Sequence, residues 1–431
     1  AQVEALALAR AINGPQHPAT AVVLNGLGRL RQTLGAFSEA EALYEAAAAI
    51  DASALGVQHP LAGRDASNLG QLYLEQGRLA EAETQFRRAL AIAEAASGPS
   101  HPAVATDLGD LATVFALGGR PEAGEPLLRR SLEIERTAFG EDTPRMAAQY
   151  GALAANLEDQ RRPADAEPLR RRALKILRTS SGEAHPDTAH ALAGAAGNLV
   201  AQGRRDDARP LLLQALEVQE AALGADSLAV AGILSQIGVL EAQAGNPGAA
   251  ESAFRRALAI RRARLGESSP ATATGHHNLA AALELAGRPE AAEAPARAAL
   301  GLRRAILPDG HPDIAASEAL LARILAPRAN AAALEHARAA MTLVRTRRLQ
   351  AGAAGDAAAR AELRARSAQS TRDPADRAFA AFLAAAAQSP DPDTLGAEAF
   401  LAAQDLEVSA AGLAMAQTAA RTAAGAGDLA R

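Results

Sequence analysis

The amino-acid sequence predicts an all-α protein built as an array of paired antiparallel helices. Three observations predict this fold: prolines spaced 42 residues apart, two glycines at fixed places in each period, and an abundance of the helix formers Ala, Leu, Arg and Glu. The chain has 431 residues but only 3% aromatic residues and no Trp, so one large globular core would lack bulky side chains. Strands are not expected.

Prolines mark where each repeat begins. Eight positions follow one another at steps of 42 residues, and we call each of them the origin of its repeat. They are Pro18, Pro60, Pro102, Pro144, Pro186, Leu228, Pro270 and Pro312. The residue before each origin is His, Thr or Ser. Thr and Ser are common N-caps, and proline fits the first helical position because it needs no N–H there, so helix A of each repeat is predicted to begin at the origin.

Two glycines divide each period into two helices. The first lies four residues before the origin, at Gly14, Gly56, Gly98, Gly140, Gly182, Gly224 and Gly266, with Pro308 in the last repeat. The second lies 17 residues after the origin, at Gly35, Gly77, Gly119, Gly203, Gly245 and Gly287, with Arg161 as the exception. Because breakers of this kind bound helices, the second repeat is predicted to have helix A over residues 60–76 and helix B over residues 79–96.

Small residues occupy two further columns of the repeat. Ten residues after the origin come Gly28, Gly70, Ala112, Ala154, Ala196, Gly238, Ala280 and Ala322. At 22 residues come Ala40, Ala82, Gly124, Ala166, Ala208, Ala250 and Ala292. These columns predict close approach of helices A and B. One helix pair cannot bury its apolar faces alone, so neighbouring pairs must stack into a solenoid.

The second repeat carries a resemblance to a known family. Its segment NLGQLYLEQGRLAEAETQFRRALAI, residues 68–92, is followed by a Gly-x-x-His-Pro joint. This pattern resembles the 42-residue class of tetratricopeptide repeat (TPR) proteins, found in kinesin light chains and in many bacterial signalling proteins. The resemblance covers about residues 1–348. It implies a right-handed α-α superhelix that binds proteins or peptides and is not an enzyme.

Four segments are expected along the chain. Residues 1–17 match the end of a truncated upstream repeat, and residues 18–311 hold seven repeats. Residues 312–350 form a degenerate capping repeat, in which Pro327 stops helix A and Ala329 replaces the turn glycine. Residues 351–431 read as a linker and additional C-terminal helices.

The last of these helices, residues 394–424, includes EAFLAAQDLEVSAAGLAMAQTAAR. It is similar to the helical spacer that precedes a caspase-like peptidase domain, called CHAT, in bacterial TPR proteins. This resemblance implies that the chain is the regulatory sensor arm of such a peptidase, whose catalytic domain would follow Arg431 and would be a partner of the repeats. The alternative is a stand-alone adaptor that bridges two proteins.

The TPR resemblance also implies that polar side chains on the inner face of helix A hold a peptide backbone in a concave groove. Mapped onto this sequence, the predicted binding residues are Asn25, Arg29, Arg64, Ser67, Asn68, Gln71, Asp110, Thr113, His277 and Asn278. The fourth and fifth repeats depart from this pattern with small residues at Gly151, Ala152, Ala155, Ala193, Gly194 and Gly197. Two interpretations stay open there. The stretch receives an apolar helix, such as the chain's own C-terminal helix, or its small residues merely tighten the superhelix.

The sequence lacks the residues and motifs that several classes of enzyme and metal-binding protein require. There is no Cys, no GxxxxGK[ST] loop and no GxSxG elbow, so no catalytic residue and no cofactor are predicted. Five of the nine histidines precede an origin and are interpreted as helix starts. His276 and His277 are adjacent on one helix, and His190 and His336 show no partner, so no metal site is predicted.

Charge and hydropathy argue against nucleic acid as a partner and against a membrane-spanning segment. A net charge of −5 with mixed signs argues against nucleic acid, and the arginine pairs of helix B are interpreted as a solvated outer face. No apolar run approaches the roughly 20 residues that a membrane helix needs. Without a signal segment, the expected location is cytoplasmic.

Overall fold

The computed structural model describes residues 2–328 and 330–353, with isolated positions at 378, 380–383, 385, 398 and 402. Within these residues the regular structure is entirely helical, and consecutive helix pairs form a solenoid, as predicted. The helices are α1 (Gln2–Asn13), α2 (Pro18–Thr33), α3 (Phe37–Leu55), α4 (Pro60–Glu75), α5 (Leu79–Ser97), α6 (Pro102–Leu117), α7 (Pro121–Phe139), α8 (Pro144–Asp159), α9 (Pro163–Ser180), α10 (Pro186–Ala201), α11 (Arg205–Leu223), α12 (Leu228–Gln243), α13 (Pro247–Leu265), α14 (Pro270–Leu285), α15 (Pro289–Ile306), α16 (Pro312–Leu325) and α17 (Asn330–Ala353).

The observed boundaries follow the predicted breakers closely. Every helix A begins at its origin, and in the second repeat helices A and B end within one residue of the predicted positions. In the last pair α16 ends two residues before Pro327, whereas α17 continues to Ala353, past the predicted end of the capping repeat. Ala329 and most of the C-terminal helices predicted after residue 351 lie outside the described residues.

The histidines before the origins are helix N-caps. In each of the five, Nδ1 accepts a hydrogen bond from the backbone N–H two residues further on, at 3.1–3.2 Å. These residues are His17, His59, His101, His185 and His311. The histidine Nδ1 thus accepts from a backbone N–H that the helix itself leaves unpaired. The predicted helix-start role is confirmed.

The turn between helices A and B requires a left-handed backbone. Gly77 has φ 72°, and its equivalents in the other repeats are similar. Arg161 adopts φ 59° at the same place and is the one described residue other than glycine with positive φ. The turn therefore keeps its geometry even where the sequence departs from glycine.

Helices A and B meet at the column ten residues after the origin, and glycine there is matched to an aromatic ring. The three pairs are Gly28 with Tyr44, Gly70 with Phe86, and Gly238 with Phe254. A Cβ atom at these glycines would lie 2.6–2.8 Å from the ring, too close for two carbon atoms. Where the column holds alanine instead, as at Ala112 and Ala196, the facing residue is Leu128 or Leu212. Glycine therefore accompanies the large aromatic ring, and alanine accompanies the smaller leucine side chain, so that the helices stay closely packed.

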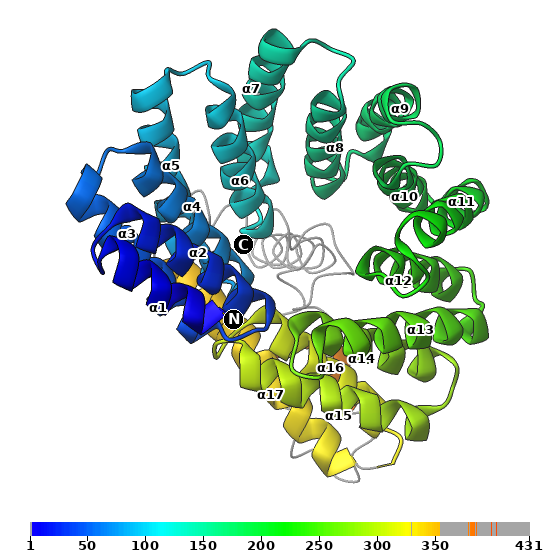
Figure 1. Cartoon of the computed structure of the whole chain (residues 1–431). Helices are drawn as coiled ribbons and strands as arrows, with labels where there is room; N and C mark the ends of the chain where they lie inside the picture. Colours follow the sequence, from blue (N-terminus) through cyan, green and yellow to red (C-terminus); the bar gives the residue numbers. More distant parts are fainter. Residues whose placement is uncertain are drawn as a thin grey trace, which may run out of the picture. The chain divides into compact units, whose positions relative to one another are not determined.

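Residues up to 272 form one compact unit, and the described residues from 273 onward belong to a second. In the first unit helices A line one side, since α2, α4, α6, α8, α10 and α12 each contact the next in this order (Figure 1). Helices B flank them on the other side. Each junction buries a shared core. Leu192, Leu212 and Ile233, from three successive helices, are at most 4% exposed and pack in one cluster. Stability is therefore shared between neighbouring pairs.

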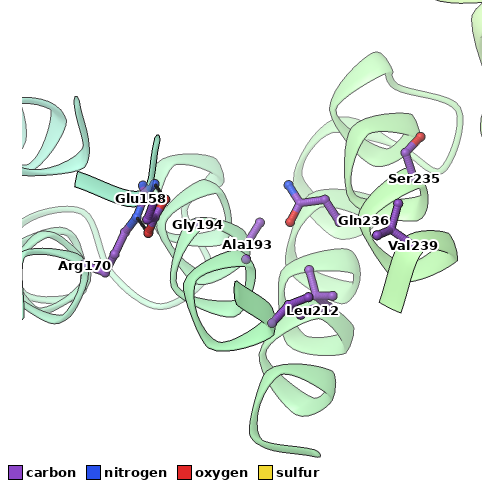
Figure 2. A pocket seen from close by; sticks show the side chains of 10 residues that line it. Glu158, Arg170, Ala193, Gly194, Leu212, Ser235, Gln236 and Val239 are labelled. Atoms are coloured by element: carbon purple, nitrogen blue, oxygen red, sulfur yellow. Dashed lines mark hydrogen bonds and ion pairs between the residues drawn. The ribbon is translucent and has the colours of Figure 1, made fainter. Parts of the chain in front are cut away.

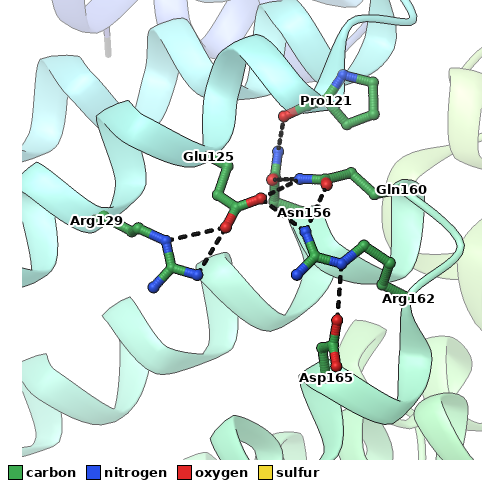
Figure 3. A network of polar contacts seen from close by, with 7 residues as sticks. All are labelled: Pro121, Glu125, Arg129, Asn156, Gln160, Arg162 and Asp165. Atoms are coloured by element: carbon green, nitrogen blue, oxygen red, sulfur yellow. Dashed lines mark hydrogen bonds and ion pairs between the residues drawn. The ribbon is translucent and has the colours of Figure 1, made fainter.

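Ion pairs also connect successive repeats. The arginine 18 residues after the origin pairs with a glutamate of the preceding helix B. The pairs are Arg78–Glu41 (2.9 Å), Arg120–Glu83 (2.6 Å), Arg162–Glu125 (3.0 Å) and Arg204–Glu167 (3.1 Å). Figure 3 shows one junction, where Asn156 donates to the carbonyl of Pro121 at 2.9 Å and Gln160 donates to Glu125 at 2.9 Å. Asn198 and Gln202 repeat these contacts in the next junction.

The junction between α11 and α12–α13 inverts this charge pattern. Arg209 stands where the other repeats have glutamate, and Asn246 stands where they have arginine. Both contact Glu241, which is 5% exposed. Arg209 Nη2 donates to Glu241 Oε2 at 3.1 Å, and Asn246 Nδ2 donates to the same atom at 2.9 Å. Glu241 is itself a third replacement, because the two preceding repeats have Leu157 and Leu199 at this position. The three replacements compensate one another, since Arg209 supplies a cation to the buried Glu241 carboxylate.

Three arginines from the pairs on helix B are solvated, as predicted. Arg87, Arg129 and Arg255 are exposed and pair with glutamates four residues earlier on their own helix. Such pairs contribute only a few tenths of a kcal/mol each, roughly 0.3–0.5. They form a solvated outer face.

Candidate functional site

The inner face is the surface formed by residues 7, 8 and 11 positions after the origin of α2, α4, α6, α8, α10 and α12. The predicted binding residues of the first three repeats lie on the three helices α2, α4 and α6. Asn25 and Arg29 belong to α2, Arg64, Ser67, Asn68 and Gln71 to α4, and Asp110 and Thr113 to α6. Successive contacts between these helices bring the residues into one row.

Some of these side chains are already engaged within the protein. Asn25 donates to Asp65 Oδ1 at 2.7 Å and accepts from Asn68 Nδ2 at 3.0 Å. Arg64 Nη2 lies 3.3 Å from Asp51 Oδ2 and 3.4 Å from Asp65 Oδ1. Asn25 and Arg64 therefore stabilise buried carboxylates, which leaves them fewer free donors for a ligand. Gln71 and Thr113 are exposed.

The two carboxylates beneath this row form a buried acid pair. Asp51 of α3 and Asp65 of α4 are both 0% exposed. Burial, followed by the charge and hydrogen bond of Asp65, raises the pKa of Asp51 to about 6. Two carboxylates at one site hold a proton more tightly than an isolated one, because both cannot ionise cheaply. The opposing effect of the Arg64 and His59 charges is smaller.

A second acidic pair lies on α6. Ser67 Oγ donates to Asp107 Oδ1 at 3.1 Å, and Asp110 follows one helical turn later. Burial raises the pKa of Asp107 to about 6, and burial followed by the charge of Asp107 raises the pKa of Asp110 to about 6. No basic side chain in the described part of the chain acts on either carboxylate.

These shifts predict an unusual dependence of stability on pH. Asp51, Asp107 and Asp110 bind protons more tightly when folded than when unfolded, so the free energy of unfolding is highest below pH 4 for these groups and falls as pH rises through about 6. Carboxylates with lowered pKa, such as Glu81 and Glu125, are ionised in both states above pH 5 and do not oppose the trend there. We expect urea denaturation to give about 1–2 kcal/mol more stability at pH 5 than at pH 7.

The matched variant is the double replacement Asp107→Asn and Asp110→Asn, which removes two of the three groups. It should reduce the difference between pH 5 and pH 7 by more than half. Equal stability of the original chain at the two pH values would show that these carboxylates titrate normally.

The fourth to sixth repeats form a hollow on the inner face (Figure 2). Its volume is about 430 Å³. It is lined by Glu158, Arg170, Ala193, Gly194, Gly197, Val200, Leu212, Ser235, Gln236 and Val239. A Cβ added to Gly197 would meet nothing within 4 Å, and at Gly151 the nearest atom would lie 3.9 Å away. Glycines at these two places open space rather than tightening the helices, in contrast to Gly70.

An ion pair closes one end of this hollow. Arg170 of α9 donates to Glu158 of α8 through Nε at 3.0 Å and Nη2 at 2.7 Å, and Asn198 donates to the same carboxylate at 2.8 Å. Both charged side chains are less than 20% exposed. The small residues predicted on helices A of these repeats gave no sign of this pair, because Arg170 comes from helix B. The signal was present: Arg170 occupies the position that holds Phe86 in the second repeat.

His277 and Asn278 lie on α14 in the second unit. The ring Nδ1 of His277 is 3.2 Å from Nη1 of Arg303, which is 5% exposed and also donates to Ser317 at 2.7 Å. His277 thus contacts a buried guanidinium. His336, which showed no partner in the sequence, lies 2.7 Å from Glu318.

Two other kinds of site are absent from the described residues, a metal-binding cluster and a membrane-spanning helix. No group of three or more His, Asp or Glu side chains is arranged to hold a metal ion there. None of the helices traced in the structure combines the length and the apolar character needed to cross a bilayer.

A family profile and several solved structures are similar to the repeats of this chain. The tetratricopeptide repeat family profile matches residues 2–53, 64–137, 144–221, 187–263 and 229–305. No curated protein matches the chain significantly. Among solved structures, BtubC (BKLC) from P. vanneervenii is 23% identical over 54% of this chain and 91% of its own, with a TM-score of 0.42. A putative kinesin light chain from Podosopora anserina with nearly identical TPR-like repeats is 24% identical over 48% of this chain and 98% of its own, with a TM-score of 0.42.

A third similar structure is the apo form of RapI, 14% identical over 66% of this chain and 98% of its own, with a TM-score of 0.48. The family profile, which covers more than half of the chain, agrees with the 42-residue repeat and with the observed helix pairs. The chain therefore belongs to the tetratricopeptide repeat family.

Proposed function

We propose that the chain is a non-catalytic scaffold that binds a protein or a peptide on its inner face. The observation that carries this proposal is the hollow between α8 and α12, which combines exposed apolar surface with the exposed amide of Gln236. Concave sites of this size and mixed lining are where proteins commonly bind ligands. Membership of the tetratricopeptide repeat family, whose solenoids typically do not catalyse reactions, supports the proposal.

The experiment is a selection of peptides from a random display library on the purified chain. Peptides that bind should lose affinity for an inner-face variant carrying Asn68→Ala, Gln71→Ala and Gln236→Ala. They should keep it for an outer-face variant carrying Arg87→Ala, Arg129→Ala and Arg255→Ala. Failure to enrich any peptide, or equal loss in both variants, would refute binding at the inner face.

For the biological setting we propose a regulatory sensor arm of a larger caspase-like peptidase. Its support is the similarity of residues 394–424 to the spacer before CHAT domains. In this proposal, ligand binding favours one arrangement of the repeats, and that preference is passed to the downstream domain. The gene sequence beyond Arg431 tests the proposal: a His and Cys pair in an α/β domain is expected, and its absence would favour the adaptor that bridges two proteins.

A further inference from the structure

The hollow on the inner face is suited to an uncharged, bulky side chain. Val200 and Val239 supply solvent-accessible apolar surface, and Val239 is 43% exposed although it lies inside a hollow. Ala193 and Leu212 form its buried floor and are at most 3% exposed. Covering such surface is favourable at roughly 25 cal/mol per Å². The space is available because Gly197 carries no side chain and meets nothing within 4 Å.

The charged residues at the edge of the hollow do not call for a charged ligand. The Glu158 carboxylate already accepts three hydrogen bonds, two from Arg170 and one from Asn198. Arg170 is in turn neutralised by Glu158. A ligand carboxylate or ammonium would have to break this pair, which is partly buried and therefore costly to separate.

The side-chain amide of Gln236 indicates whether the backbone of the ligand is extended or helical. Its side chain is exposed, lies beside the hollow (Figure 2), and makes no hydrogen bond with the residues that the structure describes. A primary amide can donate to one peptide carbonyl and accept from one peptide N–H. An extended segment has these groups free, whereas a helix uses them internally. The site therefore favours an extended segment over the apolar helix suggested by the sequence.

One charge preference comes from the neighbouring repeats on the N-terminal side. Asp107 and Asp110 lie on α6, which contacts α8, and neither has a basic partner in the described part of the first unit. Both are largely removed from solvent, Asp107 being 9% exposed. Charges left uncompensated on a binding surface favour a ligand of the opposite sign.

We propose that the hollow binds an extended polypeptide segment that places one bulky apolar side chain between α10 and α12 and directs a Lys or Arg side chain toward Asp107 and Asp110. This inference rests on the proposed function and specifies the chemistry of its ligand. It predicts a motif with an apolar anchor and a basic flank.

The test uses a fluorescent peptide obtained in the display selection, titrated against the full chain by fluorescence anisotropy. Truncating the apolar residue of the peptide to alanine should weaken binding at least about tenfold. Gly197→Leu, whose added Cβ meets nothing within 4 Å, should occupy part of the hollow, weaken the parent peptide by about the same factor and erase the effect of the truncation. Gly248→Leu, on α13 away from the inner face, where an added Cβ also meets nothing within 4 Å, is the control and should stay within about twofold.

The basic flank is tested with the double variant Asp107→Asn and Asp110→Asn. It should weaken binding at least about fivefold and reduce the salt dependence of the dissociation constant. Circular dichroism verifies that each variant keeps its helices. Selected peptides that are acidic, or whose binding is the same for Gly197→Leu and the original chain, would overturn this inference while leaving the proposed function intact. A selection that enriches no peptide at all would overturn both.

Discussion

Replacing Gly70 with alanine is expected to lower the free energy of unfolding by about 2 kcal/mol, although alanine is the better helix former. The new methyl group would lie 2.8 Å from the ring of Phe86, which is 0% exposed and cannot move aside. The helix would gain up to about 1 kcal/mol from the removal of glycine. The clash is larger, since an overfilled core must shift backbone or leave its rotamers.

Two matched variants separate packing from helix propensity. Gly109→Ala lies on α6, where an added Cβ meets nothing within 4 Å, and it should stabilise the chain by up to about 1 kcal/mol. Combining Gly70→Ala with Phe86→Leu reproduces the pair Ala112 and Leu128 of the next repeat and should recover at least half of the loss. Denaturation that ranks Gly70→Ala as more stable than the original chain would mean that these helices are not closely packed at this column.

Arg209→Glu is expected to destabilise the chain by about 3 kcal/mol. The change restores the glutamate found at this position in the preceding repeats, yet here it faces Glu241, which is 5% exposed. The buried carboxylate would lose its cation and gain a like charge. Breaking a fully buried pair costs about 3–5 kcal/mol. Because the Arg209 side chain is 40% exposed, we expect the lower end of this range, still more than the loss of an exposed pair.

Compensation provides the control for this prediction. The triple variant Arg209→Glu, Glu241→Leu and Asn246→Arg restores the residue types of the preceding junction, which has Glu167, Leu199 and Arg204 at these positions. It should return to within about 1 kcal/mol of the original stability. Arg255→Glu, on the outer face, should change stability by less than about 1 kcal/mol. Equal effects of Arg209→Glu and Arg255→Glu would contradict the buried pair.

The sequence predicts the helix boundaries well because local chemistry sets them. Proline, the His caps and the left-handed glycines act on their own backbone, so their spacing alone places α4 and α5 within one residue. The partners of side chains are harder to predict, since they depend on which helices meet. The matching of Gly70 to Phe86 was visible only as a column of small residues until the helices were placed against each other.

The candidate site shows the same division. The positions of Asn68, Gln71 and Thr113 on the inner face follow from helical periodicity. The hydrogen bond from Asn25 to Asp65 and the reach of Arg170 from helix B to the inner face do not follow from it, because each contact joins two different helices and depends on how those helices pack. Residues 351–431 carry the proposal of a downstream peptidase, and most of them lie outside the described residues.

Site-specific photo-crosslinking of a selected peptide tests most directly whether the inner face is the binding surface. A benzophenone side chain is placed at Ala155, exposed on the inner face, or at Arg255, exposed on the outer face. Binding at the inner face predicts a covalent adduct from position 155 and none above background from position 255. Adducts formed equally at both positions, or at position 255 alone, would contradict it.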